Sequence, residues 1–158
     1  MTHEQRLVAL DLQLPPAPKS IGLYRGLLVT GGMAYTSGHG PLLPGGTLIT
    51  GCVGADLDTA AGHAAARQTG LAMIATLRKE LGTLDRVRRL VKTFGLVRAA
   101  PDFTDHPAVI NGFSELMRDV FGDEAGVSAR SAVGAASLPA GMAVEVEAVF
   151  ELCPQDKS

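Results

Sequence analysis

The sequence has 158 residues, the length of one typical domain. Its 14 Lys and Arg residues nearly balance its 16 Asp and Glu residues, so a net charge of -2 is too small to attract nucleic acid by charge alone. A hydrophobic content of 46% excludes a disordered chain. The apolar stretches are too short for a membrane span, and the first residues do not form a secretion signal, so we expect a cytoplasmic protein without membrane contacts.

The chemistry-bearing residue types form no familiar cofactor motif. Cys52 and Cys153 lie far apart without a CxxC pair, which disfavours both a disulfide framework and a zinc site. The four histidines have no metal-ligand spacing such as HExxH. Gly38 and Gly40 are followed by Pro41 rather than by a helix start, so a dinucleotide fingerprint is absent. We therefore expect no metal and no cofactor.

The N-terminal segment predicts a short helix followed by a connector. Thr2 and Gln5 have the spacing of a capping box, which favours a helix through Leu10. The following LPPAPKS contains three prolines, which fix φ and remove backbone donors, so it predicts an extended connector. We accordingly predict an N-terminal extension over residues 1–19 and one domain over residues 20–153.

The rest of the chain predicts an α+β fold. The expected elements are two short strands within residues 21–37, a helix over 60–81, a strand over 87–97, a helix over 105–121, and strands over 131–137 and 142–152. This β-β-α-β-α-β-β order predicts a mixed sheet with two helices on one face. The other face would be bare, and we expect a second subunit to cover it.

The first long helix has a candidate packing stripe. At 100° per residue, six apolar side chains fall on one narrow face: Leu57, Ala60, Ala61, Ala64, Leu71 and Ala75. Most of them are small, so this face is expected to lie close against the sheet.

The last strand alternates between apolar and acidic residues. Its apolar set points to one face, and Glu145, Glu147 and Glu151 point to the other. One interpretation is a solvated strand face. The other is that one glutamate, Glu145 or Glu147, lies in a cleft with a shifted pKa and transfers protons.

Arg130 is a candidate anion-binding residue. The turn at Leu138–Gly141 predicts that the strand opened by Arg130 returns antiparallel to the Glu145 strand, which would place the two side chains together. A guanidinium binds a carboxylate through two parallel hydrogen bonds, so a small carboxylate metabolite is one partner. The alternative is a surface arginine paired with a glutamate. His39, in the Gly-Pro loop, is interpreted as either solvated or facing a ligand.

Several segments, in order, resemble the RidA/YjgF family, also labelled the L-PSP endoribonuclease family, in a longer branch with an N-terminal extension. They are Ser20–Tyr24, Thr36–Pro41, Ala129–Ser131 and Leu138–Ala148. Gly38 follows Tyr24 by fourteen positions, and Glu145 follows Arg130 by fifteen positions.

The resemblance implies a chorismate-mutase-like fold, a homotrimeric barrel, and ligand clefts between subunits. It further implies a hydrolytic deaminase acting on small enamine or imine acids such as 2-aminoacrylate, without a cofactor. In that interpretation Arg130 holds the substrate carboxylate and Glu145 places the water. Tyr24, Gly38 and Asn111 match further residues of the family's cleft.

The sequence departs from the family pattern at three positions near the expected cleft. Leu23 replaces the usual proline, His39 the usual glutamine and Ala132 a frequent cysteine. The natural substrate and pathway therefore stay open. Two other functions are kept as alternatives: a non-catalytic paralogue that binds a small metabolite, and the endoribonuclease or translation inhibitor that the family label names. RNA binding is disfavoured because aromatic residues for base stacking are scarce.

Overall fold

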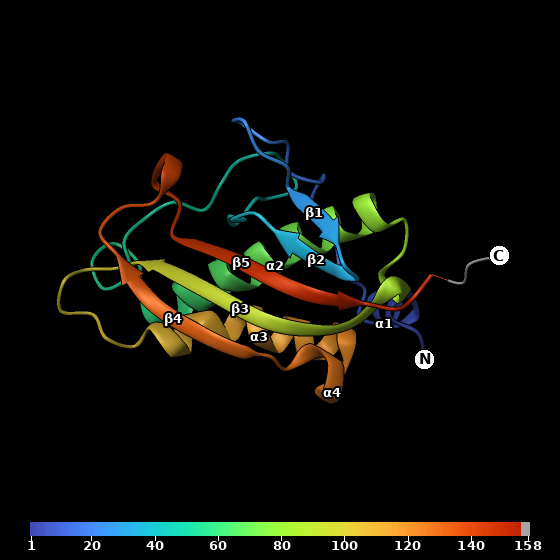
Figure 1. The fold of residues 1–158 in the computed structure, drawn as a ribbon. Helices are drawn as coiled ribbons and strands as arrows, with labels where there is room; N and C mark the ends of the chain where they lie inside the picture. Colours follow the sequence, from blue (N-terminus) through green and yellow to red (C-terminus); the bar gives the residue numbers. More distant parts are fainter. Residues whose placement is uncertain (156–158) are drawn as a thin grey trace.

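Five strands form one mixed sheet in the computed structural model, which describes residues 1–155. They are β1 (Leu27–Thr30), β2 (Met33–Thr36), β3 (Val87–Arg98), β4 (Ala129–Ala135) and β5 (Val144–Leu152). The order across the sheet is β1-β2-β5-β3-β4, and of these neighbours only β3 and β4 are parallel. The predicted α+β class is confirmed (Figure 1).

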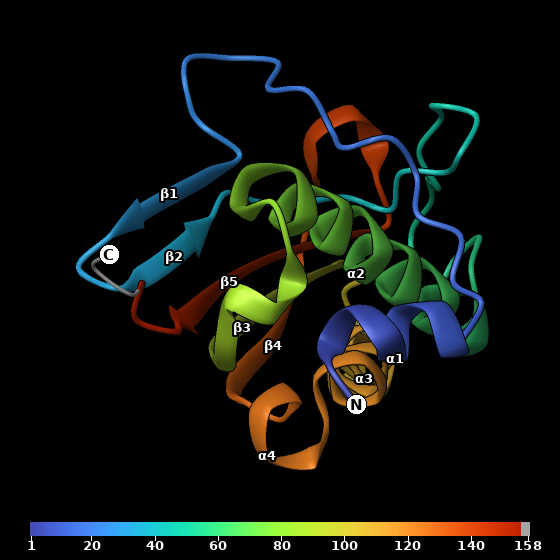
Figure 2. The same cartoon turned by 90° about the vertical axis from the view of Figure 1, so that its right-hand side faces the viewer.

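Two long helices cover one face of the sheet (Figure 2). The helices are α1 (His3–Ala9), α2 (Thr59–Leu81), α3 (His106–Phe121) and α4 (Asp123–Gly126). α2 begins after Asp58, whose carboxylate accepts the N–H of Ala61, and it ends at Gly82 with φ of 82°. The expected order of two strands, helix, strand, helix and two strands is confirmed for the main elements.

The N-terminal segment packs onto the domain. α1 begins at the predicted capping box, in which the Thr2 hydroxyl accepts the N–H of Gln5 at 3.2 Å. Leu7 belongs to the buried core, and α1 packs against α3. The carboxylate of Glu4 accepts the N–H of Leu84 at 2.9 Å. These contacts attach the segment before the proline-rich connector to the end of the helical layer.

The predicted hairpin between β4 and β5 is wrong. β4 pairs in parallel with β3 and lies at the sheet edge, whereas β5 lies at the centre between β2 and β3. The reason is that β3, α3 and β4 form a strand-helix-strand unit, whose crossover connection favours parallel pairing. The turn at Pro139–Gly141 is a 3₁₀ turn on the path that carries the chain past β3 to the centre of the sheet.

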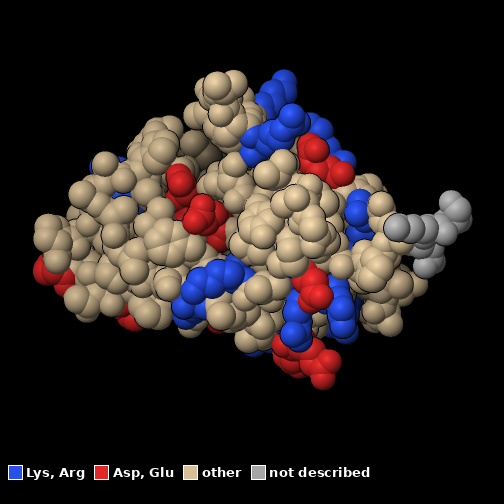
Figure 3. Space-filling view, viewed as in Figure 1, with Lys and Arg blue, Asp and Glu red and all other residues tan. Residues whose placement is uncertain are grey.

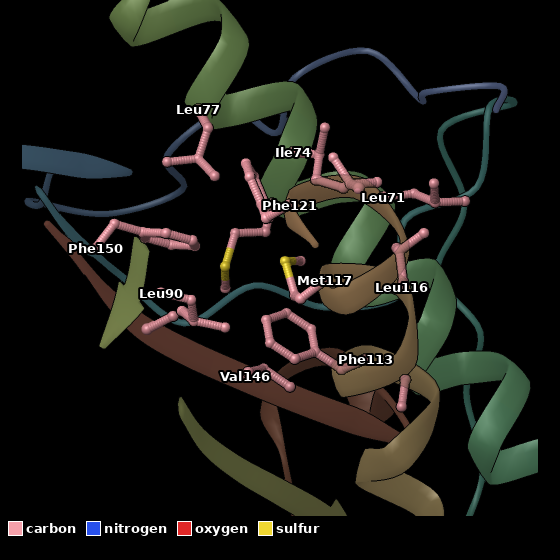
Figure 4. Close-up of a cluster of buried hydrophobic side chains, with 14 of the residues drawn as sticks. Leu71, Ile74, Leu77, Leu90, Phe113, Leu116, Met117, Phe121, Val146 and Phe150 are labelled. Carbon is pink, nitrogen blue, oxygen red and sulfur yellow. The ribbon is translucent and has the colours of Figure 1, made fainter. Parts of the chain in front are cut away.

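The core lies between the sheet and the two long helices. Figure 4 shows Phe113 and Met117 of α3 facing Phe150 of β5 and Leu77 of α2. All four side chains are fully buried. The helices approach closely at Gly112, where a Cβ atom would collide with the backbone of α2 at His63.

The predicted stripe of α2 is wrong over its first half. Ala60 and Ala64 are exposed, and the buried positions there are Gly62, Ala65 and Ala66. The predicted stripe contained only Ala and Leu and therefore left out Gly62, where α2 lies close to Val53 and Val109. From residue 69 to residue 77 every residue is buried, and the partly buried Leu12 and Leu14 of the N-terminal segment pack against the same core cluster.

The opposite sheet face is uncovered in the single chain. It carries exposed apolar side chains on neighbouring strands, such as Leu28 of β1 opposite Tyr35 of β2, and Tyr35 in turn lies opposite the half-buried Val149 of β5. Leu28 and Tyr35 have exposed fractions of 51% and 43%. Figure 3 views this side, on which uncharged residues predominate. The expected bare face is therefore present.

Candidate functional site

A cavity of about 540 Å³ lies beside the first residues of β5. Three segments enclose it: residues 18–26, which run from the end of the connector toward β1, the loop that follows β2, and the turn before β5. Its size falls in the range of small-molecule sites. Among the lining residues, Tyr24, Gly38 and Glu145 are members of the predicted site, and Lys19 and Glu145 carry charge.

Glu145 points from β5 toward the loop that follows β2. Alternation along β5 buries Val144 and Val146 under the helices and turns Glu145 to the opposite face. The backbone of Gly38 is so close to the Glu145 carboxyl that a Cβ at residue 38 would lie 2.8 Å from its Cδ. Only glycine leaves room for the carboxyl in this position.

The environment favours the protonated form of Glu145. Its side chain is half-buried, and burial raises the pKa of the carboxyl above its usual value. The negative charge of Glu147 on the same face raises that pKa further. A raised pKa makes the carboxylate a stronger base, so it accepts a proton more readily, which is what a general base requires. Glu147 is itself exposed and does not line the cavity.

His39 is buried, so the expectation of a solvated loop histidine is wrong, but the residue does line the cavity, as the ligand-facing alternative requires. Its Nδ1–H donates to the carbonyl oxygen of Ser37 at 2.7 Å, and its Nε2 accepts from the hydroxyl of Thr76 on α2 at 2.8 Å. Burial lowers the pKa of His39, so the ring is neutral at pH 7. The ring thus ties the Ser37–Gly38 backbone to α2. The backbone of His39 also pairs with Val146 of β5. The sequence of the loop alone did not predict this pairing.

Tyr24 lies in the loop between the connector and β1. It lines the cavity with an exposed fraction of 45%, and its hydroxyl accepts the N–H of Ile21 at 3.4 Å. The loop carries two further exposed apolar side chains, Ile21 and Leu23. Tyr24 therefore borders the cavity without being fixed inside it.

Arg130 lies away from Glu145 in the same chain, so their predicted contact across a hairpin is wrong. Its register partner on β3 is Thr93, which is buried on the helix-covered face, whereas Glu145 points to the open face. With strands about 4.8 Å apart and residues about 3.3 Å apart, the two Cα atoms are separated by about 14 Å.

The Arg130 guanidinium contacts α3. It donates to the hydroxyl of Ser114 at 3.1 Å and to the carbonyl oxygen of Pro107 at 3.3 Å. Asn111 is exposed on α3 and lies, by helical spacing, on the same side as these two residues. Within residues 1–155 Arg130 forms no ion pair with a carboxylate, so its charge is not neutralised there. The alternative of a surface arginine paired with a glutamate is therefore not seen in the described chain.

One chain thus presents two separate groups of predicted site residues. Tyr24, Gly38 and Glu145 surround the cavity, while Arg130 and Asn111 lie at the edge formed by β4 and α3. Over the described part of the chain, no group of three or more His, Cys, Asp and Glu side chains is arranged to hold a metal ion. None of the helices in residues 1–155 is long and apolar enough to cross a membrane.

Known proteins share this architecture over nearly the whole chain. The model of a family described as "YjgF/chorismate mutase-like, putative endoribonuclease" matches residues 4–151. The chain belongs to the YjgF/chorismate-mutase-like family. Protein TCP17 of Trypanosoma cruzi is 42% identical over 146 residues, which are 92% of this chain and 91% of that protein.

Two solved structures support the membership of this YjgF-like chain. A structure titled as a putative endoribonuclease from Shewanella oneidensis aligns with a TM-score of 0.91 and 33% identity, covering 96% of this chain and 100% of that one. The protein Atu1372 from Agrobacterium tumefaciens, titled as of unknown function, aligns with a TM-score of 0.86 and 36% identity, covering 96% and 94%. The resemblance to the RidA/YjgF family and its fold is thus confirmed.

Proposed function

We propose that this YjgF-family protein hydrolyses small 2-imino acids and their enamine tautomers to 2-oxo acids and ammonia. Water adds to C2 of the imine while the Glu145 carboxylate accepts one of its protons. The proton is then returned to nitrogen, the C–N bond breaks, and a C=O bond replaces the C=N bond. No electrons are transferred, and ammonia becomes ammonium at neutral pH.

The observation that carries the proposal is the position of Glu145. Its half-buried carboxyl faces a cavity, and burial and Glu147 both raise its pKa. A carboxylate with a raised pKa accepts the proton of the attacking water more readily. The protonated carboxyl can then give this proton to the substrate nitrogen, so one group serves in both proton transfers. An imine already reacts with water slowly, so holding the acid and placing the water are sufficient contributions.

The second supporting observation is the guanidinium of Arg130, which has no carboxylate partner in residues 1–155. Because Arg130 and Glu145 point to opposite faces of one sheet, we propose that they meet across a subunit boundary. A homotrimer, as the family resemblance implies, would also cover the exposed apolar side chains of the open face. Arg130 of one protomer would hold the substrate carboxylate near Glu145 of the next.

The test uses 2-aminoacrylate generated in situ, with release of pyruvate and ammonium followed over time. Glu145→Gln keeps the shape of the side chain but removes the base, and the rate is expected to fall by about 100-fold or more. Arg130→Ala removes a charge-assisted contact to the carboxylate, and kcat/KM is expected to fall by about 10- to 100-fold. Arg118→Ala is the matched control, because Arg118 pairs with Asp119 on the protein surface.

Lys19 is a second cation that could bind the substrate carboxylate, because it lines the cavity in the same chain as Glu145. Lys19→Ala therefore tests whether Lys19 or Arg130 has this role. If Lys19→Ala abolishes turnover and Arg130→Ala does not, Arg130 is not the carboxylate-binding residue. If wild type and Glu145→Gln release product at the same rate, the proposed chemistry is incorrect. Light scattering should give a mass near three times 16.4 kDa, and a monomer at micromolar concentration would contradict the subunit cleft.

A further inference from the structure

A group of apolar side chains lines the cavity. Leu42 and Leu48 come from the loop after β2, and Met142 comes from the residues just before β5. Pro139 and Ala140 complete this group. The Met142 and Leu48 side chains lie against Gly40, whereas the Glu145 side chain lies against Gly38, two residues earlier. A ligand in the cavity can therefore contact both the Glu145 carboxyl and this hydrocarbon surface.

Hydrogen bonds of the backbone and of one side-chain amide hold the apolar side of the cavity in place. The N–H of Leu43 donates to the carbonyl oxygen of Thr47 at 2.8 Å, which closes the loop on itself. The side-chain amide of Gln68 on α2 donates to the carbonyl oxygen of Leu42 at 2.6 Å. Thr50 forms a bridge with Met142, which connects this loop to the chain entering β5. The subsite is thus built on the scaffold and does not need a ligand to form it.

The cavity is much larger than a three-carbon substrate needs. 2-Iminopropanoate has six non-hydrogen atoms, and at the volume of liquid water, about 30 Å³ per such atom, it would fill about 180 Å³. The single chain has a cavity of about 540 Å³. The Arg130 guanidinium that the proposed function brings from the next protomer has four non-hydrogen atoms and would fill about 120 Å³ more, so substrate and guanidinium together still leave space. A small substrate would leave the apolar side in contact with water, whereas a larger apolar side chain would displace that water.

We propose that the natural substrates are 2-imino acids with a bulky apolar side chain, branched aliphatic or aromatic, which occupies the subsite formed by Leu42, Leu48 and Met142. The inference rests on the proposed function for the reacting end of the molecule. Beyond the proposed function, the inference specifies the chemical class of the side chain that the substrate carries on C2. Each buried methylene group strengthens binding by about fourfold.

Binding of the stable 2-oxo acid products tests the size preference without chemistry. Calorimetry is carried out with pyruvate and with 4-methyl-2-oxopentanoate, which has three more carbons. The larger acid is expected to bind at least about tenfold more tightly. Equal affinities, tighter binding of pyruvate, or no binding of either acid would overturn the proposal.

A variant in the subsite tests the location. Leu48→Trp extends a half-buried loop side chain into the cavity, and the ratio of the two affinities is expected to fall toward one. Val8→Trp introduces the same side chain at an exposed position of α1 and should leave the ratio unchanged. A Leu48→Trp protein that keeps the wild-type ratio, with its melting temperature retained, would place the subsite elsewhere. Leu42→Phe serves as the second variant if Leu48→Trp does not fold.

Turnover separates this inference from the proposed function. An amino acid oxidase can generate the imines of alanine and leucine in situ, and kcat/KM should be higher for the leucine-derived imine by about tenfold or more. If both imines are hydrolysed at equal rates, the deaminase function holds and the size inference fails. If neither is hydrolysed but the larger oxo acid binds more tightly, the deaminase function fails and the apolar subsite holds.

Discussion

Replacement of Gly38 by alanine tests whether the position of the Glu145 carboxyl controls activity. The added Cβ would lie 2.8 Å from the Cδ of Glu145 and 3.0 Å from its Cγ, whereas ordinary contacts begin at 3.4 Å. The carboxyl carbon therefore has to move by about 0.6 Å, and the nearer oxygen has to move further. A displacement of about 1 Å at a reacting group can reduce the rate by about 100-fold.

The same substitution is expected to preserve the fold. Gly38 is not among the glycines with positive φ, so alanine suits its backbone conformation. The group that yields is the end of a flexible side chain rather than backbone. The melting temperature should therefore stay close to that of the wild type while the rate of imine hydrolysis falls by about 100-fold.

Gly45→Ala is the matched control for Gly38→Ala, because an added Cβ at residue 45 has no neighbour within 4 Å. It should retain both rate and melting temperature. The reasoning is refuted if Gly38→Ala hydrolyses 2-aminoacrylate at the wild-type rate. It is also refuted if a crystal structure of this variant shows the Glu145 carboxyl in its original place.

Two further predictions concern pH dependence and helix packing. Glu147→Gln removes a negative charge that raises the pKa of Glu145, so the acid limb of the pH-rate profile should move to lower pH; an unchanged limb, or one moved to higher pH, would contradict this assignment. The sign follows because the base is active when ionised and a lower pKa keeps it ionised at lower pH. Gly112→Ala forces a side chain against the backbone at His63 and should destabilise the fold by about 1–3 kcal/mol. In thermal unfolding this is a fall of about 2–12 °C, whereas alanine in an unhindered helix would raise stability. A melting temperature equal to or above that of the wild type would show that the helices can separate at no cost.

The individual elements were predictable because their signals are local. The capping box at Thr2 and Gln5 needs only two side chains of one turn, and the alternation along β5 needs only one strand. Both are present in the structure. Helix ends were equally accessible, since Gly82 adopts the left-handed conformation that its residue type favours.

The partner of β4 was not predictable from the same signals, whereas the antiparallel pairing of the short strands β1 and β2 was. The short segment before β5 has the length of a hairpin turn, but the partner of β4 is chosen by the α3 crossover, which favours parallel pairing with β3. An error in pairing carries over to the site, because it placed Arg130 beside Glu145. The structure separates them onto two faces of the sheet.

The role of His39 could not be obtained from the loop sequence either. Its partner Thr76 lies on α2, 37 residues away, and both are buried. Only tertiary packing brings a neutral imidazole under the Ser37–Gly38 backbone. The sequence offered one signal, which was a histidine placed between Gly38 and Gly40.

The central place of β5 affects how the molecule can be made. β2 and β3 pair with β5 and not with each other, so neither can complete its hydrogen bonding until the ribosome has passed residue 152. During translation both strands carry unsatisfied backbone edges, which are the surfaces that promote aggregation. Cooperative folding of this sheet is consequently a late event, and a nascent chain stalled before β5 is a natural client for chaperones.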